Sequence, residues 1–262
     1  MKFTTKVVST RLQLNDAYEL LERNRYKIPE GFEEDVGQTG PDSLNFYVMG
    51  QETCVVDEEP QENTAFVSHL VPYNPASDFS PVKIEFIYVE QDYMWLAPDD
   101  PKDLSLRPQF LRGTLQACAD RTLPVVLTYQ QMLLLAGKQR KRVSVITAQS
   151  EVDEARAFLE RNGYKIPEGM ANDVWQTGPG SLNFYIMSQN DDGSILGVAK
   201  IDPPGIGGEP ADLVKITNVY MDKGCKPPAA KRQFMEDVLR VCANRMVSGV
   251  LLSVEDMACL SV

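Results

Sequence analysis

Leu21–Met49 reads LERNRYKIPEGFEEDVGQTGPDSLNFYVM, and Leu159–Met187 reads LERNGYKIPEGMANDVWQTGPGSLNFYIM. The two stretches are offset by 138 residues without a gap, and 22 of their 29 positions are identical. Because chance does not produce such identity, the sequence predicts an internal duplication. Weaker matches follow at smaller offsets, where VKIEFIYVE pairs with VKITNVYMD and LQACADR pairs with LRVCANR. The chain is therefore predicted to contain two copies of one fold.

The boundaries of the two copies follow from these offsets. The first copy is predicted to span residues 1–137 and the second 143–262, with residues 138–142 (KQRKR) as a basic linker. A polar insertion at 91–107, which contains prolines, accounts for most of the extra length of the first copy. With 262 residues, 43% apolar and 24% charged, each copy has enough apolar residues to form its own core.

Several classes of protein are not expected from the composition. No charged-then-apolar leader opens the chain, and no apolar run approaches the roughly 18 residues of a membrane span, so a cytoplasmic protein without membrane contact is predicted. Cys118 and Cys242 occupy matching positions in the two copies and are expected to be reduced thiols buried in helices. With His69 as the single histidine, no metal site of ordinary ligand type is expected.

The net charge of −11 is unevenly distributed. Residues 30–105 hold 17 Asp and Glu against two basic residues, a local balance of −15, which leaves +4 for the rest of the chain. Such a segment repels phosphates, so direct nucleic-acid binding by the first half is not expected. It favours either simple solvation or docking onto a basic protein partner.

The pattern of residues predicts the same order of elements in both copies. A strand over 1–10 precedes a helix capped by Asn15 or Asp16 that ends near Asn24. The repeated stretch is expected to form a loop, followed by strands at 43–56, 64–71 and 82–90. A helix at 108–121, a strand at 124–128 and a short helix at 129–137 complete the copy. The second copy is expected to have strands at 143–147, 182–187, 194–201, 214–222 and 249–253, helices at 150–162 and 229–245, and a short tail.

This order of elements resembles the GNAT family of N-acetyltransferases, once in each copy. The fold class expected from the resemblance is α/β (α+β), with two repeats that each contain a mixed, mostly antiparallel sheet flanked by helices. In that family a strand ending in V-x-V-D is followed by an Arg/Gln-x-x-Gly-x-Gly/Ala turn. The N–H groups of this turn bind the pyrophosphate of acetyl-CoA.

The sequence departs from the family at the cofactor turn. Val219–Asp222 (VYMD) resembles the end of the strand, and Lys226 stands where Arg or Gln is expected. Ala229 and Lys231 fall at the positions of the two small residues, and Pro227 and Pro228, which lack an N–H donor, lie between. The first copy has no Gly-x-Gly over 91–106, so the acetyl-CoA turn is degenerate in both copies, and no cofactor is the principal expectation.

The resemblance also places possible catalytic groups. Glu85 would be the base and Tyr129 the acid if the first copy were an acetyltransferase. The second copy has Thr217 or Asn218 near the former position and Val254 near the latter. Both residues also have a non-catalytic interpretation. Glu85 would then be a solvated strand residue, and Tyr129 an aromatic residue at the edge of a helix.

Three functions are therefore compatible with the sequence. Whether the protein is an enzyme is left open, with a preference against catalysis. The first is a non-catalytic protein of two degenerate acetyltransferase-like repeats that binds a macromolecule. Its acidic surface would cover the basic, nucleic-acid-binding face of a host protein, as in a viral or mobile-element inhibitor acting in the host cytoplasm. The second is an N-acetyltransferase that uses acetyl-CoA through an atypical turn. The third is a structural or assembly protein, and a homodimer is left open.

The first hypothesis assigns a set of contact residues. In GNAT-like folds the loop that corresponds to the repeated stretch lies on the acceptor side, so the chain retains that side twice and loses the cofactor side twice. The residues expected to bind a partner are Glu33, Glu34, Asp35, Glu58, Glu59, Asp99 and Asp100 in the acidic segment and Gln38, Trp175 and Gln176 in the repeated stretches.

Overall fold

The computed structural model describes residues 2–37, 43–56, 59–75, 80–91, 101–136, 142–170, 181–190, 192–203, 213–224 and 228–261. The chain forms two compact units, one of residues up to Val126 with Ser261, and one of Leu127–Leu260. The predicted boundary of the repeats lies at 137. Because compactness and ancestry are different properties, that boundary and the linker at 138–142 stay predictions.

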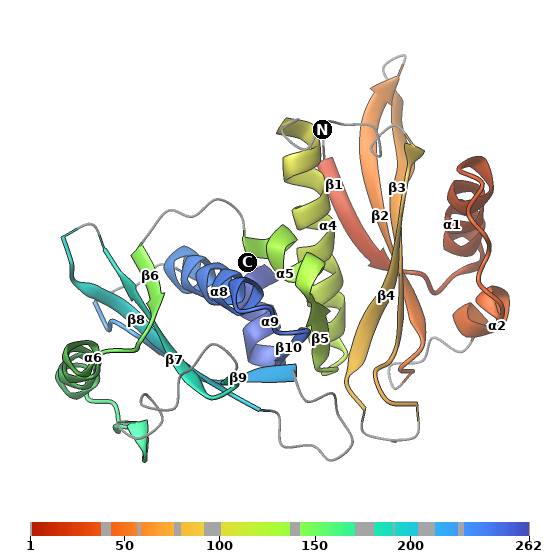
Figure 1. Ribbon diagram of the computed structural model, residues 1–262. Coiled ribbons are helices and arrows are strands. Elements are labelled where there is room, and N and C mark those ends of the chain that lie inside the picture. Colours follow the sequence, from red (N-terminus) through yellow and green to blue (C-terminus); the bar gives the residue numbers. More distant parts are fainter. Residues whose placement is uncertain are drawn as a thin grey trace. The chain divides into compact units, whose positions relative to one another are not determined.

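The first unit contains a sheet with the strand order β1-β2-β3-β4-β5. These strands are β1 (Lys2–Val7), β2 (Phe46–Val56), β3 (Glu59–Pro72), β4 (Val82–Val89) and β5 (Val125–Thr128), whose last two residues belong to the second unit. The first three pairings are antiparallel and the β4–β5 pairing is parallel. Helices α1 (Arg11–Arg23) and α2 (Phe32–Gly37) lie on one face, and α4 (Pro101–Asp120) lies on the other (Figure 1).

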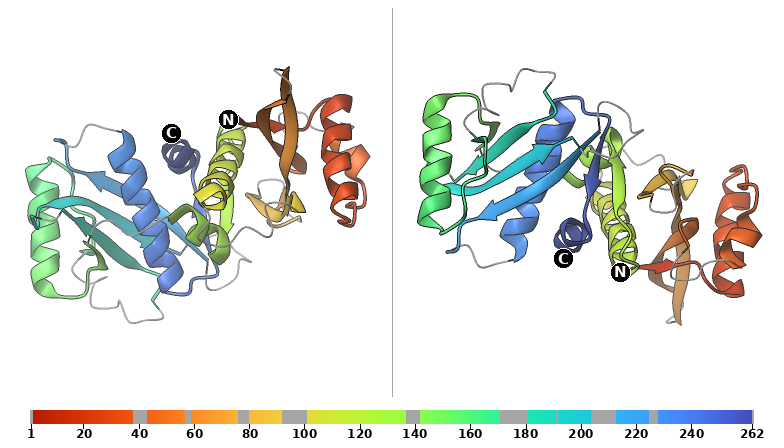
Figure 2. Two further views of the ribbon diagram at one scale, coloured as in Figure 1. Left: turned by 90° about the horizontal axis from the view of Figure 1, so that it is seen from above. Right: turned by 90° about the horizontal axis from the view of Figure 1, so that it is seen from below.

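The second unit has the strand order β6-β7-β8-β9-β10. The strands are β6 (Arg142–Val145), β7 (Phe184–Gln189), β8 (Ile195–Asp202), β9 (Leu213–Met221) and β10 (Gly249–Leu252), again antiparallel except for the β9–β10 pair. Helix α6 (Gln149–Arg161) covers one face and α8 (Pro228–Asn244) the other, as both views of Figure 2 show. Helices α5 (Tyr129–Ala136) and α9 (Val254–Ser261) complete the described elements. The predicted mixed, mostly antiparallel sheet flanked by helices is confirmed.

Each unit buries an apolar cluster between its first helix and its sheet. In the first unit Leu14, Ala17, Leu20 and Leu21 of α1, at helical spacing, pack against sheet residues that include Tyr47. In the second unit Val152, Ala155, Phe158 and Leu159 of α6 occupy the matching places against Tyr185 and Val198. The amphipathic pattern of these helices is therefore sufficient to place them on the sheets.

Several predicted boundaries are wrong for identifiable reasons. Helix α1 begins at Arg11 and is capped by Thr10 in a capping box with Gln13, so Asn15 and Asp16 lie inside the helix. Helix α6 begins at Gln149, where Glu151 accepts from the backbone N–H of Ala148. Thr10 and Gln13 match the Ser/Thr-x-x-Glu/Gln pattern of a capping box, so the start of α1 was available in the sequence.

Three further segments differ from prediction. Helix α4 begins at Pro101, whereas the sequence predicts its start at Pro108. Pro108 lies inside the helix, where its missing N–H removes one hydrogen bond without ending the helix. The repeated stretch was expected to be a loop, but Phe32–Gly37 forms the short helix α2 in the first unit. The predicted tail after β10 is helix α9.

Candidate functional site

The start of each repeated stretch is attached to the end of a strand. Asn24 accepts a hydrogen bond through Oδ1 from the N–H of Gln91 at 2.6 Å, and the hydroxyl of Tyr26 donates to the carbonyl of Val89 at 2.9 Å. The second copy makes the same two contacts with the end of β9. The N–H of Lys223 donates to Oδ1 of Asn162 at 2.9 Å, and the hydroxyl of Tyr164 donates to the carbonyl of Met221 at 2.9 Å. This half of the repeated stretch is thus held by packing within its own unit.

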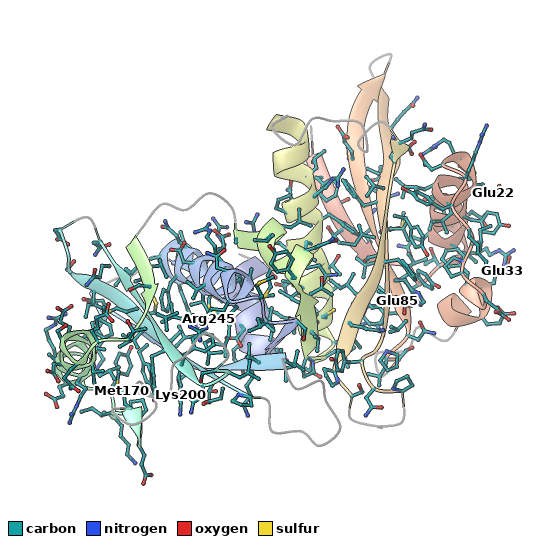
Figure 3. All side chains as sticks on the ribbon, in the orientation of Figure 1. Glu22, Glu33, Glu85, Met170, Lys200 and Arg245 are labelled. Carbon is teal, nitrogen blue, oxygen red and sulfur yellow. The ribbon has the colours of Figure 1, made fainter. Side chains whose placement is uncertain are left out.

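The end of each stretch, Ser-Leu-Asn-Phe, is held by an arginine that follows the long helix. The Arg121 guanidinium lies 4.4 Å from the centre of the Phe46 ring and donates to the carbonyl of Ser43 at 3.4 Å. Arg245 makes the same contacts, at 4.4 Å from the Phe184 ring and 3.3 Å from the carbonyl of Ser181. Figure 3 shows Arg245 in the second unit. A structural role therefore accounts for both ends of the repeat.

A cluster of polar side chains lies beside this anchor in the first unit. The strand register sets Tyr47 opposite His69, whose imidazole stacks on the Tyr47 ring at 4.4 Å with 5° between the planes. His69 is 8% exposed, and its Nε2 lies 2.7 Å from Oδ1 of Asn45. Its Nδ1 faces the Glu85 carboxylate at 3.7 Å, and Lys83 lies 3.5 Å from the same carboxylate. Glu85, labelled in Figure 3, sits in the irregularity of the β3–β4 pairing next to His69.

The matching positions of the second unit carry different chemistry. Lys200 replaces His69 beside Tyr185, with its ammonium 5.7 Å from the ring centre and 3.4 Å from the Asp202 carboxylate (Figure 3). Thr217 takes the place of Glu85 and donates to Asp202 at 2.6 Å. Oδ1 of Asn183, the counterpart of Asn45, is buried and has no hydrogen-bond partner among the described residues. Only the first of the two described sites thus pairs an imidazole with a carboxylate.

The neighbouring tyrosines show the difference in local field. Burial raises the pKa of Tyr88, and the Glu85 carboxylate raises it further. Burial also raises the pKa of Tyr220 at the matching position, but there the Lys200 ammonium opposes the shift. The neighbouring charged side chain thus raises the tyrosine pKa in the first unit and lowers it in the second.

An open hollow of about 280 Å³ lies between α1 and α2 in the first unit. Leu14 and Tyr18 line it together with Asn15, Glu19 and Glu33. Figure 3 labels Glu33 on α2 and Glu22 on α1. Sequence reading identified Glu33 from local charge alone and missed Tyr18 and Glu19, because helix-to-helix proximity cannot be read from one sequence.

The other predicted partner residues lie in different places. Glu34 is exposed on α2, next to Glu33. Asp35 belongs to α2 and Glu59 to β3, and for both the structure describes the backbone only. The predicted residues outside the described part of the chain are Gln38, Glu58, Asp99, Asp100, Trp175 and Gln176. These assignments stay predictions.

Tyr129, the acid expected if the chain is an acetyltransferase, begins α5 in the second unit and is 45% exposed. Glu85 belongs to the first unit. The cluster around Glu85 was missed by sequence reading, which identified His69 only as the single histidine and did not place Asn45 or Glu85 beside it. The register of β2 with β3 brings His69 and Asn45 together, and neither composition nor spacing determines this register.

In the described part of the expected cofactor turn, two backbone N–H groups have acceptors within the chain. The N–H of Lys223 donates to Asn162, and the N–H of Gly224 donates to the Asp222 carboxylate at 2.7 Å. Pro228 is the first residue of α8 and has no N–H. Ala229 and Lys231 are exposed in the first turn of α8, and Lys226 lies outside the described residues. Whether this turn binds a cofactor stays a prediction.

The predicted buried thiols are confirmed. Cys118 on α4 and Cys242 on α8 are buried and unpaired, and burial raises the pKa of each to about 12. Within the described ranges, no group of three or more His, Cys, Asp or Glu side chains is placed to hold a metal ion. None of the described helices is long and apolar enough to cross a membrane.

Comparison with known proteins gives structural matches only. No protein-family model and no curated protein matches the chain. A probable N-acyltransferase of unknown function from Enterococcus faecalis V583 is 9% identical, with 96% of this chain and 65% of that chain covered and a TM-score of 0.30. The N-myristoyltransferase of Saccharomyces cerevisiae is 10% identical over 95% and 72% of the chains, with a TM-score of 0.33. A GCN5-related N-acetyltransferase from Sphaerobacter thermophilus is 12% identical over 96% and 86%, with a TM-score of 0.29.

All three of these proteins are named as acyltransferases. At TM-scores below 0.5 these matches define neither the family nor the function of this chain.

Proposed function

We propose that the chain is a binding protein whose first unit presents a negatively charged surface to a basic protein partner. The observation that carries the proposal is the local balance of −15 over residues 30–105, together with the exposed Glu33 and Glu34 on α2. Part of that charge is neutralised inside the unit, since Arg23 pairs with Glu90 and Lys6 with Glu62. Glu19, Glu22 and Glu34 are exposed on α1 and α2, while Glu33 lies 3.7 Å from the Arg11 guanidinium.

Two physical arguments support binding over catalysis. The turn between β9 and α8 has two of its N–H groups already bonded and a proline at the helix start, which disfavours acyl-CoA. A surface of one sign speeds the association of a partner of opposite sign and disfavours partners of the same sign.

The test is a titration of the full chain with fluorescent nona-arginine at roughly 0.01 M and 0.15 M salt, where screening lengths differ about fourfold. We expect binding at low salt that weakens as salt rises, and no binding of a nona-glutamate control. The proposal fails if nona-arginine does not bind at low salt, or if its affinity does not change with salt.

The second candidate is amine N-acylation, and the pairing of Glu85 with His69 is the observation that favours it. A carboxylate 36% exposed beside an imidazole can accept the proton that an ammonium substrate loses before it attacks an acyl group. Transfer from acetyl-CoA to small amines, lost in Glu85→Gln, would establish this candidate in place of the first. Absence of transfer in the wild-type protein would remove it.

A further inference from the structure

The hollow between α1 and α2 combines three kinds of side chain. Leu14 is buried at its base, and the Tyr18 ring, 6.4 Å from the ring of Phe32, forms part of its lining. Glu19 from α1 and Glu33 from α2 bring two carboxylates to the same hollow. Its volume of about 280 Å³ suits one long side chain better than a large ligand.

The second copy has lost this combination at the matching sequence positions. With the offset of 138 residues, Tyr18 corresponds to Arg156, Glu19 to Ala157 and Glu33 to Ala171. The neighbouring Glu34 corresponds to Asn172. These changes lie in or beside a stretch that is otherwise nearly identical in the two copies. Packing within the unit explains the identical positions, and it gives no reason for carboxylates in one copy alone.

The electrostatic environment of α1 is consistent with an attracting site. Burial raises the pKa of Asp16, and Glu19 and Glu62 raise it further, while Lys6 acts in the opposite direction. Negative charges therefore outweigh positive ones along this side of the helix. A cation placed near Glu19 relieves that repulsion.

An arginine of the chain already faces one of the two carboxylates. The guanidinium of Arg11 lies 3.7 Å from the Glu33 carboxylate, with side chains 75% and 59% exposed. Exposed pairs of this kind contribute little to stability, so an incoming cation can displace Arg11.

We propose that the hollow between α1 and α2 is a docking site for one arginine or lysine side chain of a basic protein partner. The apolar stem of that side chain packs on Leu14 and the Tyr18 ring, and its charged end lies between Glu19 and Glu33. The inference deepens the proposed function, because it names the residues through which the acidic first unit recognises its partner.

The test compares nona-arginine affinity among variants of the full chain at low salt. Glu19→Ala with Glu33→Ala installs the residues that the second copy has at these positions, and the control Glu22→Ala removes the same kind of charge from an exposed position of α1 outside the hollow. Two exposed ion pairs predict a loss of about tenfold for the double variant, and less than about twofold for the control. Arg11→Ala is expected to strengthen binding, because it removes the competing cation. Circular dichroism checks that each variant is folded.

Each remaining outcome is informative. Because the control removes one charge and the double variant removes two, a loss of binding free energy in Glu22→Ala of half that of the double variant means diffuse attraction, which overturns the hollow and leaves the proposed function standing. Unchanged affinity in the double variant has the same meaning. If spermidine binds with the predicted dependence on Glu19 and Glu33 while nona-arginine does not, the hollow is a small-amine site, and docking of a protein is wrong. If wild-type protein fails to bind nona-arginine at all, the proposed function itself fails.

Discussion

Replacement of Arg121 or Arg245 by alanine tests why the end of the repeated stretch is shared by both copies. Each guanidinium lies 4.4 Å from a phenylalanine ring centre, and each donates one bond of 3.3–3.4 Å to a serine carbonyl. A partly exposed cation–π contact contributes about 0.5–1 kcal/mol, and a long hydrogen bond from a charged donor about 1.5 kcal/mol. Burial lowers the pKa of both arginines, so desolvation offsets part of this gain. We expect a loss of about 2 kcal/mol at either site.

Urea unfolding followed by circular dichroism measures the loss, with arginine-to-lysine variants as matched controls. Lysine keeps the charge but lacks the planar fork, so about half of the loss is expected to remain. A loss below about 0.5 kcal/mol in both alanine variants would show that the Ser-Leu-Asn-Phe segment needs no such anchor. The identity of the two copies would then need a functional explanation.

Three further predictions concern single sites. Arg25 has a φ of 58° at the position where the second copy has Gly163 with a φ of 65°, so Arg25→Gly should raise unfolding free energy by about 0.5–1 kcal/mol and Gly163→Ala should lower it by a similar amount in urea titrations. With pKa values of about 12, Cys118 and Cys242 should stay unmodified by iodoacetamide at neutral pH until the protein unfolds, as peptide mass spectrometry would detect; rapid labelling would contradict their burial. Burial raises the pKa of Asp256, so its stabilising contribution is complete below the unfolded-state pKa and is lost as pH rises through the folded-state pKa. Asp256→Asn should therefore gain stability relative to wild type as pH rises from acid to neutral, and a constant difference would refute this.

Sequence alone predicted the order of elements because periodicity and β-branched residues mark them locally. VKIEFIYVE, for example, is β4 within one residue at its C-terminal end. Helix starts were less predictable, since Pro101 and Pro108 are both plausible first residues and only packing shows that the helix includes both. The same limit applies to α2, whose six residues follow a turn in which Gly31 has a φ of 79°.

The candidate site was predictable only in part. Glu33 could be identified from charge and Glu85 from the order of elements. The imidazole beside Glu85 depends on the register of β3 with β4, and the hollow depends on the approach of α2 to α1. Both are contacts between residues distant in sequence. They require the register of the strands and the path of the repeated stretch, which local pattern does not determine.

The two repeated stretches share the residues that anchor them within their own units, and the two units differ at the polar cluster and at the hollow. Asn24, Tyr26 and Arg121 make contacts that Asn162, Tyr164 and Arg245 repeat. His69 and Glu19, by contrast, have Lys200 and Ala157 at the matching positions. The acidic segment over residues 30–105 belongs to the first unit, and our proposal of a partner rests on that charge.

A paired calorimetric titration of the full chain at low salt tests this account most directly, with nona-arginine in one cell and acetyl-CoA in the other. The account predicts saturable heat with the peptide and none with acetyl-CoA at millimolar concentration. Saturable heat with acetyl-CoA, and none with the peptide, would contradict it.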